Sequence, residues 1–153
     1  MLYLEVMKKQ IRVKGKVALV FGVFDLIHKG HISFLKQAKK HGEKLVAIVA
    51  RDSSVKKIKK RFPHESERQR LNNVRVVRGV SRAVLGDKVH GSYDVLTRLK
   101  PDVACLGYDQ RELERDLRAR IRKKELPNIK IVRLKAHKPK KFKTSIVAKN
   151  HFS

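Results

Sequence analysis

The sequence has one cysteine and no tryptophan, and aromatic residues make up only 6% of its 153 positions. Because a single cysteine excludes an internal disulfide, the chain is not a disulfide-stabilised secreted domain, and we expect it in the reducing cytoplasm. Cys105 lies in the apolar run DVACLG, a pattern typical of a buried and unreactive thiol. No apolar run approaches the roughly 20 residues of a membrane span, and we expect no signal peptide within residues 1–16. The sequence therefore predicts a soluble protein without a membrane partner.

Acidic residues are also scarce, since 14 Asp and Glu stand against 39 Lys and Arg and give a formal net charge of +25. A site for one nucleoside triphosphate accounts for only part of this excess. The remainder gives a positive surface, which attracts polyanions in a salt-dependent way. Two interpretations stay open: a nucleic-acid partner, and a lysine-rich surface that has no partner.

Three continuous apolar runs, residues 16–22, 44–50 and 102–107, are predicted to be strands. Strands that are buried on both faces have this pattern, which is typical of a parallel sheet covered by helices. Residues 129–134 alternate between apolar and polar positions and are predicted to form an edge strand. Residues 82–86 are predicted to form a further, short strand.

Helical patterns separate these strands. One predicted helix begins at His31 and stops at Gly42, a residue that favours a helix C-terminus. A second opens with the capping-box spacing of Ser66 and Gln69 after Pro63. Two more helices are expected over residues 93–100 and over the charged segment that ends before Pro127, where apolar residues repeat every four positions.

The alternation of strand and helix predicts a doubly wound α/β fold, a Rossmann-like parallel sheet of about five strands. The length fits a single domain, which we assign to residues 16–153. Residues 1–15 form an N-terminal extension whose role the sequence does not reveal.

The segment GVFDLIHKGH, from Gly22 to His31, follows the first predicted strand. In doubly wound folds ligands bind beyond the carboxyl ends of the strands, near the point where the strand order reverses. Gly22 lets the backbone pass close to a phosphate, Gly30 allows a tight turn, and the helix after it has free N–H groups that favour an anion. His28 and His31 can donate hydrogen bonds to a phosphate there. The segment therefore predicts a phosphate site.

This segment resembles the G-T-F-D-x-x-H-x-G-H signature of the nucleotidyltransferase superfamily that includes the cytidylyltransferases, and the resemblance extends from about Lys16 to Lys149. It implies that His28 and His31 are catalytic and hold the α-phosphate. It also places Gly22, Val23, Phe24, Asp25 and Gly30 at the nucleotide. Val23 departs from the usual threonine, so one hydroxyl near the phosphates is missing. Asp25 has two open roles, to orient the loop or to help a metal ion.

Further segments carry the same resemblance. ARDSSVKKIKKR resembles the family's K-x-K segment, which implies phosphate-binding roles for Lys57 and Lys59, although a lysine run is also typical of a solvated, charged loop. Lys60 replaces a frequent glycine there. ERQRL resembles a family helix and implies that Arg70 binds the leaving pyrophosphate, with a surface ion pair as the alternative.

Two C-terminal motifs resemble those of archaeal FAD synthases. In LGYDQ the resemblance implies that Gly107, Tyr108 and Asp109 face the nucleotide, with core packing as the alternative for Tyr108. The tail KFKTSIV implies contacts to phosphate or base. Its residues with that role are Lys143, Thr144 and Ser145.

The resemblance implies an enzyme that transfers a nucleoside monophosphate from a triphosphate to a phosphorylated acceptor and releases pyrophosphate. ATP and FMN, giving FAD, are the substrates expected first; CTP and a phosphorylated small alcohol are the alternative. Mg²⁺ is expected, held mainly by the substrate phosphates and water, and a homodimer is implied. In a different class, the same fold serves as a basic nucleic-acid-binding protein.

Overall fold

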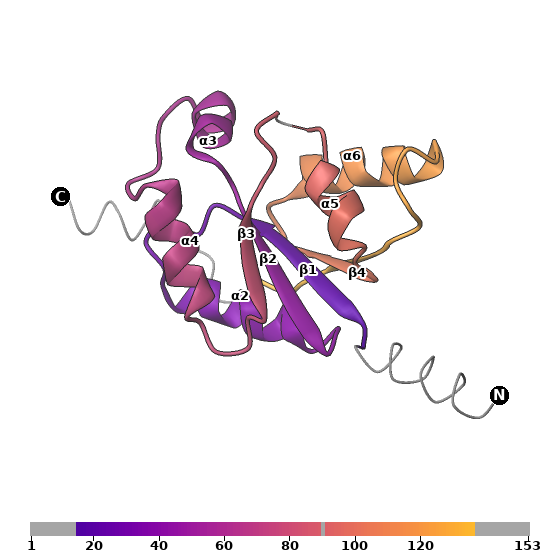
Figure 1. The fold of residues 1–153 in the computed structure, drawn as a ribbon, viewed down its shortest axis with the longest axis horizontal. Coiled ribbons are helices and arrows are strands. Elements are labelled where there is room, and N and C mark those ends of the chain that lie inside the picture. Colours follow the sequence, from indigo (N-terminus) through magenta and orange to yellow (C-terminus); the bar gives the residue numbers. More distant parts are fainter. Residues whose placement is uncertain (1–14, 90, 137–153) are drawn as a thin grey trace.

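The computed structural model describes residues 15–89 and 91–136. Its centre is a sheet of five parallel strands in the order β3-β2-β1-β4-β5 (Figure 1). The strands are β1 Val17–Gly22, β2 Lys44–Val49, β3 Arg82–Leu85, β4 Val103–Leu106 and β5 Lys130–Arg133. The prediction of a Rossmann-like, doubly wound parallel sheet is confirmed, as is the edge position of the last strand.

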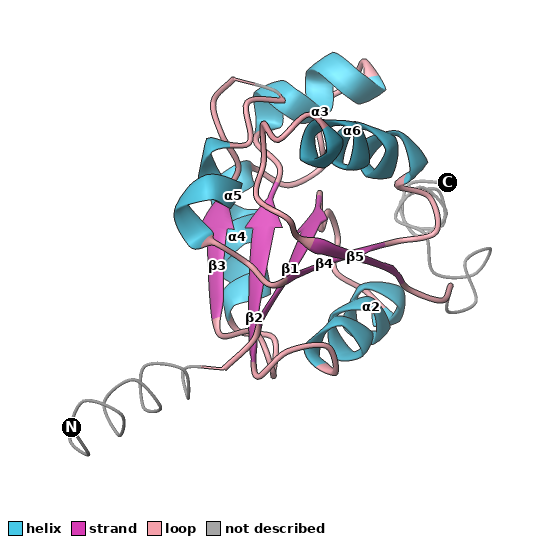
Figure 2. Ribbon diagram, turned by 90° about the vertical axis from the view of Figure 1, so that its right-hand side faces the viewer, coloured by secondary structure: helices cyan, strands magenta, loops and turns pink. Residues whose placement is uncertain are grey.

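Helices cover both faces of the sheet (Figures 1 and 2). They are α2 Lys29–Lys39, α3 Asp52–Lys59, α4 Glu67–Arg75, α5 Asp94–Leu99 and α6 Arg111–Arg122. Leu35 of α2 and Val74 of α4 belong to the core on one face, whereas Leu96 of α5 and Leu117 of α6 belong to the core on the other. None of the helices among the described residues could span a membrane.

The continuous apolar pattern of β1 follows from its central position. Ala18, Leu19 and Val20 are all 0% exposed, and they face alternate sides of the sheet because successive strand side chains point in opposite directions. Ala18 and Val20 therefore pack with α2 and α4, whereas Leu19 packs with Val95 of α5. Each fully buried aliphatic side chain of this kind stabilises the fold by about 1.5–3 kcal/mol.

The order of the strands fixes where a ligand fits. The chain passes from β1 to β2 and β3 on one side, and then returns to β4 on the other side of β1. The register pairs Val20 with Cys105, so the residues that follow β1 and β4 lie side by side at the carboxyl edge. Strand order reverses there, and the loops diverge to leave a crevice.

The lysine segment after β2, for which a charged loop was one interpretation, is helix α3, with Val55 buried at 3% exposure and Lys60 ending the helix in the left-handed conformation at φ 62°. One local expectation was wrong. The first helix begins at Lys29 rather than at His31, because His28 caps it.

Candidate active site

His28 and His31 hold each other and the start of α2 in a reciprocal cap. The Gly30 backbone N–H donates to Nδ1 of His28 at 3.0 Å, and the His28 backbone N–H donates to Nδ1 of His31 at 3.2 Å. Their rings stack with centroids 3.9 Å apart at 26°. Both side chains line the same pocket, so the two imidazoles lie together at the positive end of the helix.

The cap also fixes the protons of both imidazoles. Because each Nδ1 accepts a backbone N–H, each neutral ring carries its own proton on Nε2 and can donate it. Burial lowers the pKa of His31 from 6.5 to about 3, and the positive charge of Lys59 acts in the same direction. Burial also lowers the pKa of His28. At neutral pH the site therefore presents neutral Nε2–H donors.

The loop between β1 and α2 turns sharply enough to need two unusual backbone conformations. Phe24 and Leu26 both have left-handed backbones, at φ 55° and φ 53°. The Phe24 ring folds back over Gly22, where an added Cβ would lie 2.6 Å from the ring, and it lies 5.8 Å from the His31 ring. Gly22 is thus required for the packing of Phe24 that positions His31.

Both carboxylate oxygens of Asp25 accept hydrogen bonds from the protein. It accepts the backbone N–H groups of His64 at 2.7 Å and Glu65 at 2.9 Å, and it also lies 2.9 Å from Nδ1 of His64. Burial alone raises the pKa of this carboxyl, but the hydrogen bonds outweigh burial and hold the pKa below its ordinary value. Glu65 returns the contact by accepting the Leu26 backbone N–H at 2.8 Å. These contacts join the loop after β1 to residues 64–65.

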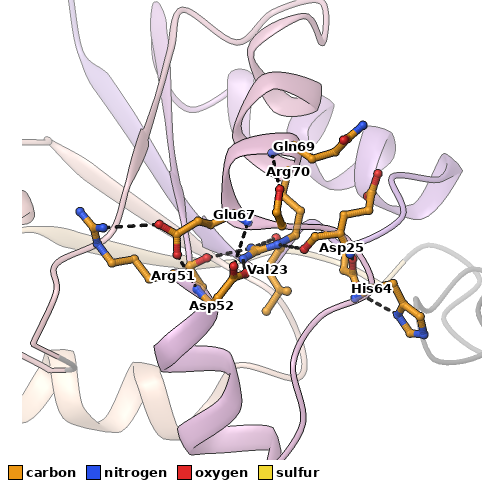
Figure 3. A network of polar contacts seen from close by, with 11 residues as sticks. Val23, Asp25, Arg51, Asp52, His64, Glu67, Gln69 and Arg70 are labelled. Atoms are coloured by element: carbon orange, nitrogen blue, oxygen red, sulfur yellow. Dashed lines mark hydrogen bonds and ion pairs between the residues drawn. The ribbon is translucent and has the colours of Figure 1, made fainter.

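Arg70 was expected to contact pyrophosphate, but it is not among the residues that line the pocket. Figure 3 shows it within a network of polar contacts with Val23 and Asp52. Its side chain is 0% exposed. It donates to the carbonyls of Val23 at 2.8 Å and Ala50 at 2.7 Å, which continue β1 and β2. It also donates to the Glu65 carbonyl at 3.0 Å and to Oδ1 of Asp52 at 2.7 Å. Arg70 is therefore a positioning residue that clamps the loops after both strands.

The acids around this clamp join α3 to α4. Asp52 and Glu67 exchange contacts, since the Asp52 backbone N–H donates to Glu67 at 2.9 Å and the Glu67 backbone N–H donates to Asp52 at 3.2 Å. Arg51 lies 3.5 Å from Glu67. Figure 3 shows this network between the two helices. Asp52 and Glu67 were absent from the residues expected at the site.

Across the switch point, Gln110 ties β4 to β1. Its Oε1 accepts the Gly107 backbone N–H at 2.8 Å, and its Nε2 donates to the Phe21 carbonyl at 2.9 Å. Gln110 is the last residue of the LGYDQ motif, but sequence reasoning gave it no role. It precedes a helix, at a position where glutamine is an uncommon cap. Gly107 lies close to its neighbours, because an added Cβ would be 3.1 Å from Oδ1 of Asp109.

A pocket of about 1230 Å³ opens at this point and joins most of the expected site. The two lysines of the K-x-K segment separate here, because Lys59 lines the pocket and Lys57 does not. Helical positions two apart point to different faces, whereas an extended loop would place them on one side. The expected residues that line the pocket are Gly22, Val23, Phe24, Asp25, His28, Gly30, His31, Lys59, Gly107, Tyr108 and Asp109. The expected residues Lys143, Thr144 and Ser145 lie outside the described part of the chain.

The described residues do not build a metal centre of their own. No group of three or more His, Cys, Asp or Glu side chains in residues 15–89 and 91–136 could hold a metal ion.

The fold and the site define a nucleotide-binding α/β protein, with neutral imidazole donors at a helix N-terminus beside the switch-point pocket. Residues 19–150 match the cytidylyltransferase-like family, and the chain belongs to that family. The nucleotidyltransferase class implied by the motif is thereby confirmed.

The relatives extend over most of the chain. An FAD synthase of Archaeoglobus profundus is 44% identical over 115 residues, which cover 75% of this chain and 72% of the relative. An FAD synthase of Thermococcus sibiricus is 38% identical over 139 residues, which cover 90% of each chain. The crystal structure of the lipopolysaccharide core biosynthesis protein from Thermoplasma volcanium superposes with a TM-score of 0.73 and 36% identity, over 80% of this chain and 98% of that one.

Proposed function

We propose that the protein transfers the adenylyl group of ATP to FMN, giving FAD and pyrophosphate. The observation that carries this proposal is the stacked, neutral histidine pair at the start of α2, which lines a pocket of about 1230 Å³. Pockets for one small ligand have volumes of about 300–1,000 Å³, so this one has room for two substrates. The 38–44% identity to FAD synthases supports the choice of substrates.

In this reaction a phosphate oxygen of FMN attacks the α-phosphorus of ATP. A new P–O–P bond forms, the bond between the α- and β-phosphates breaks, and pyrophosphate leaves with the electron pair of that bond. Negative charge grows on the α-phosphate oxygens and on the leaving group. The Nε2–H groups of His28 and His31 would stabilise that charge, and each such donor is worth about 10²–10³ in rate.

Neutral donors suit this position. Imidazoles that carry no charge do not hold the substrate phosphates as tightly as a cation would, and their hydrogen bonds strengthen as charge develops in the transition state. The backbone cap keeps each ring oriented before substrate arrives, so little reorganisation is needed.

The remaining charge of the phosphates is met by Lys59 and by Mg²⁺. Lys59 lies at the pocket, and its charge already acts on His31. A bound Mg²⁺ would neutralise part of the phosphate charge, and it would be held mainly by substrate phosphates and water. Tyr108 and Asp109, which line the pocket after β4, would face the base.

Pyrophosphate release from the purified protein tests the proposal, with ATP or CTP offered against FMN and a panel of phosphorylated alcohols. His31→Ala is the loss-of-function variant, and His41→Ala, an exposed histidine after α2, is its matched control. We expect turnover with ATP and FMN that His31→Ala reduces at least about 10²-fold and His41→Ala leaves unchanged. Turnover with CTP and an alcohol phosphate alone would overturn the substrates and keep the reaction class. Release that is equal in both variants would overturn the role of His31.

We also propose a homodimer, as the family resemblance implies. Light scattering at micromolar concentration measures the mass directly, and a monomer of 17.7 kDa would contradict it.

A further inference from the structure

Charge is distributed unevenly between the two ends of the sheet. The acidic residues gather where the strands end, around the pocket and at the starts of the helices. They are Asp25, Asp52, Glu65, Glu67, Asp87, Asp94, Asp109, Glu112, Glu114 and Asp116. The opposite end, where the strands begin, has few acids and many cations. In Figure 2 this end lies below, away from the arrowheads of β2 and β3.

We define the basic edge as residue 16 together with segments 39–44, 75–82, 98–102 and 122–130, which lead into the five strands. Its acids are Glu43, Asp102 and Glu125. Its cations are Lys16, Lys39, Lys40, Lys44, Arg75, Arg78, Arg82, Arg98, Lys100, Arg122, Lys123, Lys124 and Lys130. All of these cations except Lys39 are exposed.

Backbone contacts hold these segments in one row. The Glu43 N–H donates to the Lys16 carbonyl at 2.9 Å, and the Asp102 N–H donates to the Val17 carbonyl at 2.9 Å. The Lys130 N–H in turn donates to the Asp102 carbonyl at 3.1 Å. Neighbouring strands lie about 4.8 Å apart, so the row spans about 19 Å. The Ser81 N–H donates to the Leu45 carbonyl at 2.8 Å, so backbone hydrogen bonds join the starts of all five strands.

The fold explains only some of the cations of the basic edge. Arg75, Arg98 and Arg122 lie in the last turns of their helices, where a cation stabilises the helix dipole. Lys44, Arg82 and Lys130 begin strands, so they gain nothing from a helix end. Among the described residues, no ion pair includes any cation of the edge.

We propose that the basic edge binds the phosphate backbone of a duplex nucleic acid, independently of the nucleotide pocket at the other end of the sheet. Charge complementarity identifies the partner, since a duplex carries one negative charge per about 1.7 Å of its axis. About six phosphates on the near side face a row of about 19 Å. Single-stranded nucleic acid fits less well, because the edge has no Phe, Tyr or Trp on which bases could stack.

An anionic membrane is a weaker fit. Peripheral attachment combines cations with exposed apolar side chains that enter the lipid. Of the exposed large apolar side chains among the described residues, Val76 alone lies on the basic edge. The basic edge thus has cations that could bind phosphates but almost no exposed apolar side chain that could enter a membrane.

Fluorescence anisotropy with a labelled 20-base-pair DNA duplex and an RNA duplex of the same sequence tests this proposal across a salt series. The edge variant neutralises four exposed cations of the basic edge: Lys40→Gln, Lys44→Gln, Arg78→Gln and Lys123→Gln. The control variant removes the same charge from the other end of the molecule: Lys56→Gln, Lys60→Gln, Arg68→Gln and Lys88→Gln. Both lower the formal net charge of +25 by the same amount.

For the wild type we expect log K to fall against log salt with a slope of about −5. The edge variant should lose at least 10-fold in affinity and flatten the slope by about 3, whereas the control variant should stay within 3-fold. Saturating ATP and FMN should not displace the duplex, and the edge variant should keep the wild-type rate of pyrophosphate release.

Four results would overturn the proposal. The first is the absence of duplex binding at low salt, and the second is an equal loss in both variants, which would mean that the charge acts diffusely. The third is displacement of the duplex by ATP and FMN, which would place it in the pocket. The fourth is binding of anionic phosphatidylglycerol vesicles that the edge variant abolishes while its duplex affinity is unchanged, which would identify a membrane as the partner.

Discussion

Replacing Arg70 by methionine separates a structural clamp from a pyrophosphate ligand. Methionine fills a similar volume but donates no hydrogen bond, so the carbonyls of Val23, Ala50 and Glu65 lose their partner. Each buried acceptor left without a partner costs about 1–3 kcal/mol. Breaking a buried ion pair costs about 3–5 kcal/mol, although Asp52 can be partly rehydrated because its side chain is 32% exposed.

These costs overlap, and we expect Arg70→Met to lower the free energy of unfolding by about 3–5 kcal/mol. For a chain of this size that corresponds to a fall of about 10 °C in Tm. Urea and thermal unfolding followed by circular dichroism measure both quantities. Arg68→Met makes the same change two residues earlier on the exposed face of α4, and should stay within about 0.5 kcal/mol of the wild type. An Arg70→Met protein of wild-type stability whose activity is lost would refute the clamp and restore the pyrophosphate role.

Three further outcomes follow from the site. The pKa of His31 is about 3 in the folded protein, against the ordinary 6.5. Below pH 6.5 the unfolded chain therefore binds a proton at His31 that the folded chain does not bind, so the free energy of unfolding falls. His31→Gln should remove about 2 kcal/mol of the loss between pH 7.5 and pH 5 in urea titrations, and an unchanged pH dependence would show that the ring protonates normally. Lys59→Ala should lower kcat/KM by about 10–100-fold and Lys57→Ala by less than 3-fold, and equal effects would place both lysines at the phosphates. Gln110→Ala should cost about 1–3 kcal/mol in urea unfolding, and a smaller loss would mean that Gln110 does not join β1 to β4.

The strands could be predicted because continuous apolar runs in the sequence indicate strands buried on both faces. A run such as VALVFG has no polar position, which only a strand covered on both faces tolerates. The glycine and the two histidines after it then mark the switch point. In the structure Gly22, His28 and His31 line one pocket, and their roles there stay a prediction.

The remaining features depend on contacts between distant segments. Histidine is not among the favoured helix caps, and at His28 the cap is reciprocal, because the side chain of His31 accepts the His28 backbone N–H. Arg68 and Arg70 look alike in the sequence, and only the approach of β1 and β2 decides which one is buried. The K-x-K lysines share a face in a loop and separate in a helix, so the state of α3 decides which of them reaches the pocket.

Transfer of label from ATP tests the central claim most directly. The purified protein is incubated with FMN, Mg²⁺ and ATP labelled with ³²P at the α-phosphate, in parallel with ATP labelled at the γ-phosphate, and the products are separated by chromatography. The account predicts that the α-label appears in FAD and the γ-label in pyrophosphate, and that His31→Ala slows both at least about 10²-fold. Label from the γ-phosphate in a flavin product, or unchanged FMN beside active transfer to another acceptor, would contradict it.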